Sequence, residues 1–215
     1  AWSTCSTLAR GPPSWSATPQ SRAGFRQCGP MTPQPCVRRY SCSPTWGIVG
    51  SPGAGKTTLA DRLRLRKPDL LVFDPEEIGF VVKATVPPAA SGDYQDLPLW
   101  RALTIAALAE LRRYYLQDIV VPMTLVRPDY LDELLGGARR IDDELLHVFL
   151  DLDAELLRDR IERQVMHPDP FRNREICQWR LAQMERCLSA RERLPDGTLV
   201  LDSGDHDPDA LAAMV

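Results

Sequence analysis

The stretch GIVGSPGAGKTTLADRL, residues 47–63, joins a short apolar run, a glycine-rich turn and the start of a helical pattern. The turn has the spacing G-x-x-x-x-G-K-[ST], in which glycines permit a tight bend and successive backbone N–H groups converge on an anion. A helix that begins near the lysine directs the positive end of its dipole to the same point. We therefore predict a nucleoside-triphosphate site made of Gly50, Ser51, Pro52, Gly53, Ala54, Gly55, Lys56, Thr57 and Thr58.

Two side chains of this loop have chemical roles beyond the turn itself. The ammonium group of Lys56 can reach the β- and γ-phosphates, and the hydroxyl of Thr57 can ligate Mg²⁺. The sequence thus predicts a phosphate-binding loop placed between a buried strand and a helix, which is the context that makes the motif specific.

From Trp46 onward, apolar runs alternate with helical patterns. The strands are predicted at 46–49, 70–74, 118–126, 145–152 and 197–204. The helices are predicted at 57–66, 75–86, 98–116, 128–140, 153–166, 175–193 and 207–215, where the chain stops inside the last one. The helix at 98–116 is apolar on most of its circumference, so we expect it to be covered on several sides. Five apolar strands alternating with helices predict an α/β fold with a mostly parallel sheet covered on both faces.

Residues 1–45 differ from the rest of the chain. They contain five arginines, no acidic residue, many serines and prolines, and four of the six cysteines, Cys5, Cys28, Cys36 and Cys42. No helical or strand period is found, and the cysteine spacings match no zinc pattern. We interpret 1–45 as a disordered or non-native tail, with a transit peptide as the alternative, and 46–215 as the nucleotide-binding domain.

Composition excludes several classes of function. The net charge is −3, and residues 46–215 hold 21 of the 26 basic residues and all 29 acidic ones, so no electrostatic footprint for nucleic acid is present. No apolar run approaches the roughly 20 residues of a membrane span. We expect a cytoplasmic protein without a transmembrane segment, while peripheral membrane contact and the oligomeric state stay open.

The carboxyl ends of the strands are where a phosphate loop places an active site. The second strand ends in Asp74, which could bind Mg²⁺ through water, accept a proton from a substrate hydroxyl or cap the next helix. Glu76 and Glu77 follow in the first turn of that helix and suit its dipole. The third strand lacks a closing Asp, which argues against a motor-type or repair ATPase, and places Met123 and Thr124 at a pocket floor or, for Met123, in the core.

Arginines of a lid segment stabilise the γ-phosphate as it moves in small-molecule kinases. The segment 158–180 contains Arg158, Arg160, Arg163, Arg172, Arg174 and Arg180. We favour Arg160, Arg172 and Arg174 as catalytic residues because they lie at or beside the polar break HPDPFRNR, residues 167–174.

Several motifs together resemble the tunicamycin-resistance (TmrB-type) P-loop proteins. They are GSPGAGKTTLADRL, LVFDPEEIGF, DYQDLPLWR, IVVPMTLV, DELLGG, FLDLDAELLRDRIE and RLAQMERCLSA…LVLDSG, spread over residues 46–215. That family is similar to nucleotide and shikimate kinases, and the resemblance implies a three-layer kinase fold with a five-stranded sheet in the order 2-3-1-4-5. It also implies ATP and Mg²⁺ as cofactors, resistance to tunicamycin, and a substrate side formed by Asp74, Gln95, Asp96 and Arg101.

Two hypotheses follow for the function. The first is an ATP-dependent phosphotransferase acting on a hydroxyl of a small molecule, either tunicamycin or a related nucleoside antibiotic or sugar, with a nucleoside or metabolite kinase as a further alternative. The second is a non-catalytic protein that binds ATP and sequesters the drug. Asp74, the lid arginines and the missing acid on the third strand favour the enzyme.

Overall fold

The computed structural model describes residues 44–125 and 127–215. Five parallel strands form one sheet in the order β2-β3-β1-β4-β5, which confirms the predicted topology. The strands are β1 (Thr45–Gly50), β2 (Leu71–Val72), β3 (Ile119–Met123), β4 (Leu146–Asp151) and β5 (Leu199–Asp202). β1 lies in the middle, between β3 and β4, so the phosphate loop leaves the sheet at its centre.

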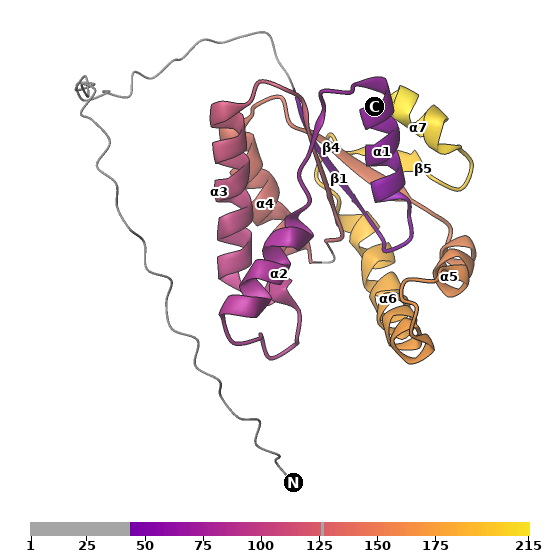
Figure 1. Cartoon of the computed structure of the whole chain (residues 1–215). Coiled ribbons are helices and arrows are strands. Elements are labelled where there is room, and N and C mark those ends of the chain that lie inside the picture. The colour runs from indigo at the N-terminus through magenta and orange to yellow at the C-terminus, as the bar shows by residue number, and fades with distance from the viewer. Residues whose placement is uncertain (1–43, 126) are drawn as a thin grey trace, which may run out of the picture. The chain divides into compact units, whose positions relative to one another are not determined.

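Helices cover both faces of this sheet, and Figure 1 shows α3 and α4 on one side of the strands and α1 and α7 on the other. The helices are α1 (Lys56–Arg66), α2 (Pro75–Thr85), α3 (Pro98–Tyr114), α4 (Pro128–Ile141), α5 (Ala154–Arg163), α6 (Pro170–Ala190) and α7 (Pro208–Met214). Two single 3₁₀ turns, η1 (Tyr94–Asp96) and η2 (Arg191–Arg193), precede α3 and follow α6.

Side chains on the two faces of the central strands pack into two separate hydrophobic cores. Val49 of β1 points into the core under α2, α3 and α4, and Ile48 points into the core under α1 and α7. This division follows from the alternation of side chains along a strand. A third, smaller core joins α5 and α6 through Leu157, Ile161 and Met184. The α5–α6 pair is therefore packed as a unit beside the sheet.

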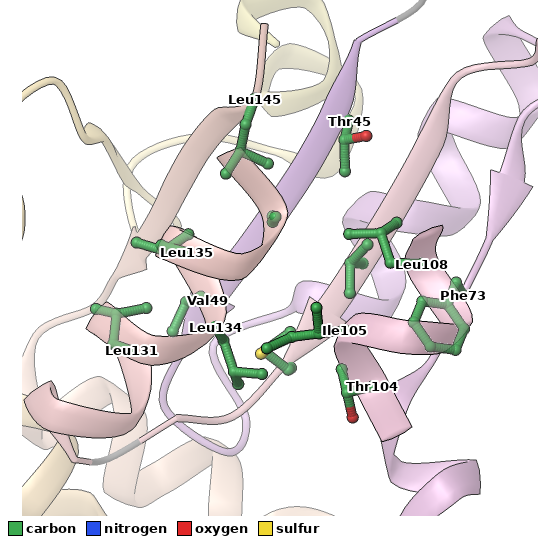
Figure 2. Close-up of a pocket in the computed structure, with 14 residues that line it drawn as sticks. Thr45, Val49, Phe73, Thr104, Ile105, Leu108, Leu131, Leu134, Leu135 and Leu145 are labelled. Atoms are coloured by element: carbon green, nitrogen blue, oxygen red, sulfur yellow. The ribbon is translucent and has the colours of Figure 1, made fainter. Parts of the chain in front are cut away.

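A small apolar cavity of about 40 Å³ remains between the sheet and the α3–α4 layer. Figure 2 shows side chains of α3 and α4, among them Ile105, Leu108, Leu134 and Leu135, turned toward Val49 of the central strand. Gly47 also lines this space, where a larger residue would fill part of it. The cavity is an imperfection of core packing and not a ligand site, because its walls are almost entirely apolar and its volume is close to that of a water molecule.

Aspartate and proline set the helix starts. Asp74 caps α2 and Asp169 caps α6, each followed by proline at the first helical position. The predicted start of α6 at residue 175 is wrong, since the Asp169–Pro170 pair begins the helix within the polar segment. The expectation for α3 is also wrong, because Leu99 and Leu103 are 42% and 39% exposed and the helix packs on one side only.

The predictions for the N-terminal segment concern residues that lie largely outside the described part of the chain. The interpretation of residues 1–45 as a tail, including Cys5, Cys28, Cys36 and Cys42, concerns residues 1–43 that are not described, together with Pro44 and Thr45. Thr45 itself is the first residue of β1 and is fully buried. None of the helices in the described ranges has the length and apolar character needed to cross a membrane.

Candidate functional site

The phosphate loop turns between β1 and α1 through three glycines that serve two purposes. Gly53 and Gly55 have φ angles of 95° and 98°, a left-handed conformation that side chains disfavour. At Gly50 a Cβ atom would lie only 2.7 Å from the carbonyl oxygen of Leu150 on the neighbouring strand. The loop therefore depends on glycine both for its curvature and for the close approach of β4.

Lys56 begins α1 and folds back over the loop. Its Nζ donates hydrogen bonds to the carbonyl oxygens of Gly50 and Ser51, both at 2.9 Å. Burial lowers the pKa of Lys56 to about 8, although the carboxylates of Glu76 and Asp74 act in the opposite direction. The hydrogen-bond partners of this ammonium group are neutral carbonyl oxygens, and a phosphate at the loop would give it an anionic partner.

A cavity of about 530 Å³ opens in front of the loop and α1. Its polar lining includes loop residues, threonine hydroxyls at the start of α1, and arginines from α5 and α6. The lining residues are Gly53, Gly55, Lys56, Thr57, Thr58, Arg160, Arg163, Gln164, Met166 and Arg180. The site thus joins the predicted phosphate loop to the predicted lid segment.

Arg180 of α6 is an arginine of the predicted lid segment that the sequence did not favour over Arg160, Arg172 and Arg174, and the structure places it at the phosphate loop. It is 7% exposed, and a Cβ on Gly53 would lie 3.3 Å from its Nη2 atom, so the guanidinium lies against the loop. Its Nη1 atom is buried and has no hydrogen-bond partner within the described ranges. Burial lowers the pKa of the Arg180 guanidinium. A buried cation without a partner is costly and suits an anionic ligand.

The other lid arginines occupy different positions. Arg160 lines the cavity and its Nη2 donates to the carbonyl oxygen of Ser203 at 2.8 Å, which links α5 to the loop after β5. Arg163 also lines the cavity and pairs with Asp159 of its own helix at 2.7 Å. Arg172 and Arg174 lie exposed in the first turns of α6 and line neither cavity described in this section. The structure does not bring these two to the phosphate loop.

A second cavity of about 530 Å³ adjoins the first and shares Lys56, Thr57, Met166 and Arg180 with it. Its remaining walls come from the phosphate loop, α2, the 92–95 segment, the end of β3 and α6. They are Pro52, Glu76, Phe80, Lys83, Gly92, Asp93, Tyr94, Gln95, Thr124, Ile176 and Trp179. The wall is more apolar and aromatic than the phosphate side, which is typical of a small-molecule pocket.

The sequence predicted that Asp74 either caps α2 or acts in the active site, and the structure distributes these positions over Asp74 and Glu76. The Oδ1 atom of Asp74 accepts the backbone N–H of Glu76 at 2.9 Å, so Asp74 is the cap of α2. The carboxylate next to Lys56 that lines the cavity is that of Glu76. Although the residue is exposed, partial loss of hydration around its carboxylate, together with the nearby Asp74, raises its pKa. Both carboxylates act on the Lys56 ammonium.

Of the remaining residues expected on the substrate side, some line the second cavity and others do not. Gln95 and Thr124 line the second cavity, and the Nε2 atom of Gln95 donates to the Thr124 carbonyl oxygen at 2.7 Å. Arg101 is buried, pairs with Glu133 and donates to the Gln95 carbonyl oxygen at 2.6 Å. Asp96 accepts a hydrogen bond from Tyr130 at 2.8 Å. Met123 is 9% exposed and lies in the core, as one of the two readings expected.

These residues fit a nucleoside triphosphate with Mg²⁺. The loop geometry, the Lys56 ammonium and the unpaired Arg180 nitrogen offer positive partners for phosphate oxygens. In the described ranges no cluster of three or more His, Cys, Asp or Glu residues could hold a metal by itself. Magnesium bound to nucleotides needs few protein ligands and retains waters, so the Thr57 hydroxyl would hold it together with phosphate oxygens.

The same architecture occurs in known proteins. The profile of the AAA domain family matches residues 46–190. The structure resembles the tunicamycin resistance protein of Deinococcus radiodurans, with a TM-score of 0.59 and 23% identity over 80% of this chain and 93% of that one. It also resembles a sugar kinase from Janibacter sp. HTCC2649, with a TM-score of 0.54 and 20% identity over 80% and 92% of the two chains.

A gluconokinase from Sinorhizobium meliloti 1021 has a TM-score of 0.51 and 17% identity over 80% of this chain and 88% of its own. No curated protein sequence shows significant similarity to the chain. At these identities the likenesses establish the fold, and they confirm the expected relation to tunicamycin-resistance proteins and P-loop kinases at that level. With its profile match over 46–190 and this fold, the chain belongs to the AAA domain family and has a P-loop kinase-like architecture.

Proposed function

We propose that this domain transfers the γ-phosphoryl group of ATP to a hydroxyl of a small molecule, tunicamycin or a related nucleoside antibiotic. The observation that carries the proposal is the position of Arg180, which lines two cavities together with Lys56. Its Nη1 atom is buried and has no hydrogen-bond partner within the described ranges. One cavity suits the nucleotide and the other suits the acceptor. The kinase and tunicamycin-resistance names of the similar structures support this assignment.

The chain's own residues supply charge and positioning for this transfer. Bound ATP supplies the phosphoryl group, and Thr57 would hold Mg²⁺ with the phosphate oxygens. Lys56 and Arg180 stabilise negative charge that spreads over the phosphoryl oxygens. A bond forms between phosphorus and the acceptor oxygen as the bond to the β-phosphate oxygen breaks. The hydroxyl proton then passes to a nearby carboxylate.

Glu76 is the best-placed carboxylate to take that proton, because it lines the acceptor cavity. Asp74 uses one oxygen to cap α2, and Asp93, which also lines the cavity, accepts the backbone N–H of Gln95. The raised pKa of Glu76 also brings its proton affinity closer to that of a general base at neutral pH. Asp74 keeps a supporting role near Lys56, where it could hold Mg²⁺ through water.

A pair of isosteric variants separates the two carboxylates. Glu76→Gln should lower turnover about 10²-fold or more, as expected for a positioned base, with ATP affinity within a few-fold of the wild type. Asp74→Asn keeps the capping oxygen, and its melting temperature should therefore stay unchanged. Full turnover in Glu76→Gln together with loss in Asp74→Asn would return the base to Asp74.

The alternative is a non-catalytic protein that closes over the drug with ATP bound, and the use of Asp74 as a helix cap favours it. The discriminating experiment is incubation of the protein with Mg-ATP and tunicamycin, followed by mass spectrometry of the drug. A mass gain of one phosphate group, absent in Lys56→Ala, supports phosphotransfer. Unmodified drug bound in stoichiometric amount supports sequestration and rejects the proposed reaction.

A further inference from the structure

Gln95 is fixed at one wall of the acceptor cavity by three hydrogen bonds. Its backbone N–H donates to Asp93 Oδ1 at 2.9 Å, and its backbone carbonyl accepts from Arg101 Nη1 at 2.6 Å. Its side-chain Nε2 donates to the Thr124 carbonyl oxygen at 2.7 Å. Because a carbonyl can only accept, this last bond fixes which end of the amide is nitrogen.

The remaining atom of the amide, Oε1 of Gln95, is buried and has no partner in the described part of the chain. A buried acceptor without a donor is uncommon and costs free energy that a ligand can restore. Gln95 is one of the residues that line the acceptor cavity, which makes a bound acceptor the candidate source of that donor.

A cluster that we call the Tyr130 clamp holds this segment in place; it consists of Asp96, Arg101, Arg127 and Tyr130. The guanidinium groups of Arg101 and Arg127 both lie over the Tyr130 ring, at 4.1 and 4.3 Å from its centre. The Tyr130 hydroxyl donates to Asp96 Oδ1 at 2.8 Å. Contacts of a cation with an aromatic face are attractive and orient the guanidinium plane.

The clamp reaches Gln95 by two routes. Arg101 bonds directly to the Gln95 carbonyl oxygen, and Asp96 is the next residue in the chain. On the opposite side of Gln95, the Tyr94 ring packs on Gly79 of α2, where a Cβ would come within 2.8 Å of the ring. The segment Tyr94–Asp96 is therefore anchored to α2, α3 and α4 together.

We propose that the Tyr130 clamp is a positioning device for acceptor recognition, which holds Gln95 so that its Oε1 accepts a hydrogen bond from an N–H or O–H group of the acceptor. This inference rests on the proposed function for the identity of the cavity. Arg101 and Asp96 then act through Gln95 and do not touch the acceptor themselves. An acceptor that presents no donor at this point binds about tenfold to a hundredfold more weakly.

The first arm of the test needs no ligand. Hydrogen–deuterium exchange of the segment 91–97 is measured in the wild type, Tyr130→Leu and the matched control Tyr114→Leu. Tyr114 is an exposed tyrosine near the other end of α3 that also carries an arginine over its ring. We expect faster exchange in 91–97 only for Tyr130→Leu, with an intermediate rate for Tyr130→Phe, which keeps the ring and loses the hydroxyl bond.

The second arm measures dissociation constants for ATP and for tunicamycin. Gln95→Met and Tyr130→Leu should weaken tunicamycin about tenfold or more while ATP affinity stays within twofold, a split that a general loss of stability would not produce. If Tyr130→Leu does not fold, Tyr130→Phe replaces it in both arms.

Unchanged exchange in 91–97 for the folded Tyr130 variant overturns the clamp. Wild-type tunicamycin affinity in Gln95→Met overturns the role of Oε1, and so does an equal loss of ATP and tunicamycin binding. If the wild type binds ATP but no tunicamycin, the proposed substrate is wrong, and the ligand-free exchange arm still decides the clamp.

Discussion

Buried polar groups are paired differently at the two ends of the strands, which we call the amino edge and the carboxyl edge of the sheet. At the amino ends of the strands, Arg112 and Asp142 form an ion pair at 3.1 Å, and Thr45 donates to Asp142 at 2.6 Å and accepts from Arg112. At the carboxyl ends, Arg180 Nη1 and Gln95 Oε1 are buried without partners among residues 44–125 and 127–215. The network at the amino edge, which we call the saturated edge, has all its partners, whereas the carboxyl edge, which we call the incomplete edge, does not.

This difference separates stability from function. In the Arg112–Asp142–Thr45 network each charge has its partner within the protein, so the network needs no group from solution. Unpaired groups destabilise the free protein, and a fold retains them where a ligand completes them. The incomplete edge contains a donor on the phosphate side and an acceptor on the opposite wall. The unpaired donor Arg180 Nη1 suits a ligand with an anionic group, and the unpaired acceptor Gln95 Oε1 suits a ligand with an N–H or O–H group.

His147 is an instructive exception at the amino edge. It is 2% exposed, and its Nδ1 lies 2.9 Å from the Thr198 hydroxyl, which itself donates to Pro195. Because the Thr198 hydroxyl uses its hydrogen on Pro195, it accepts from His147, and Nδ1 carries the proton. The Nε2 atom is then an acceptor, and it has no partner in the described structure. His147 lines neither functional cavity. An unpaired atom indicates a site only where it faces a cavity.

The largest effect is expected at Lys56. Lys56→Ala removes the ammonium that bonds to the phosphate loop and, with nucleotide bound, to phosphate oxygens. Losing about two charge-assisted hydrogen bonds should cost about 4 kcal/mol of ATP binding, on the order of 10³-fold. Isothermal titration with ATP measures this, with the melting temperature as control. Wild-type ATP affinity in the folded variant would contradict the assignment of the loop.

Arg180→Met gives the next largest effect and tests the incomplete edge directly. Loss of a preorganised cation should reduce phosphoryl transfer about 10²- to 10³-fold. The unfolding free energy in the absence of ligand should stay equal or rise, because a buried unpaired charge is replaced by an apolar side chain of similar length.

The matched control for Arg180→Met is Asp142→Ala at the saturated edge. This variant leaves Arg112 buried without its partner and should destabilise the protein by about 3 kcal/mol or more, with ATP affinity retained. Urea unfolding of both variants gives the comparison. Equal destabilisation of the two would show that Arg180 is structural and that the two edges do not differ.

The phosphate loop could be predicted from sequence because its residues form one contiguous stretch. The spacing of its glycines is typical of one backbone conformation. Gly50 through Thr58 are read off in order, and the strand before and helix after confirm the context. The sheet order followed from the family resemblance. The alternation of strands with helices already required a mostly parallel sheet.

Arg180 could not be predicted by the same reasoning, since its burial depends on the docking of α6 on α5. A signal was nevertheless present. Cys177, Leu181, Met184 and Leu188 form an apolar stripe along α6, and Arg180 lies on that stripe between its first and third members. An arginine inside an apolar stripe is a stronger candidate for function than arginines in a polar break, such as Arg172 and Arg174.

A smaller effect is expected from the titration of His147, whose pKa is lowered to about 4 by burial and by the nearby Arg139 charge. The unfolded chain takes up a proton near its ordinary pKa of about 6.5 and the folded protein does not, so stability falls as pH decreases through this window. Between about pH 7 and pH 4.5 the contribution is about 2 kcal/mol.

Replacement of the histidine isolates that contribution. His147→Gln should flatten the dependence of the unfolding free energy on pH by about 2 kcal/mol over the same range. Urea unfolding at several pH values measures it, with an exposed-site variant such as Tyr114→Leu as control. An unaltered slope in His147→Gln would assign the acid sensitivity to other groups.

The smallest effect concerns Gly47 on the face of β1 that meets the α3–α4 layer. A Cβ there would touch only the His147 ring, at 3.9 Å, and would enter the apolar cavity of about 40 Å³. Gly47→Ala should therefore raise the unfolding free energy by about 0.5–1 kcal/mol, through lower entropy of the unfolded chain and better packing. The control is Gly137→Ala, where a Cβ would come within 2.6 Å of Ile105 and should destabilise. Because neither glycine belongs to the incomplete edge, both variants should keep wild-type ATP affinity. A loss of affinity in the stabilised Gly47→Ala protein would mean that the core and the phosphate edge are coupled, which their separate networks argue against.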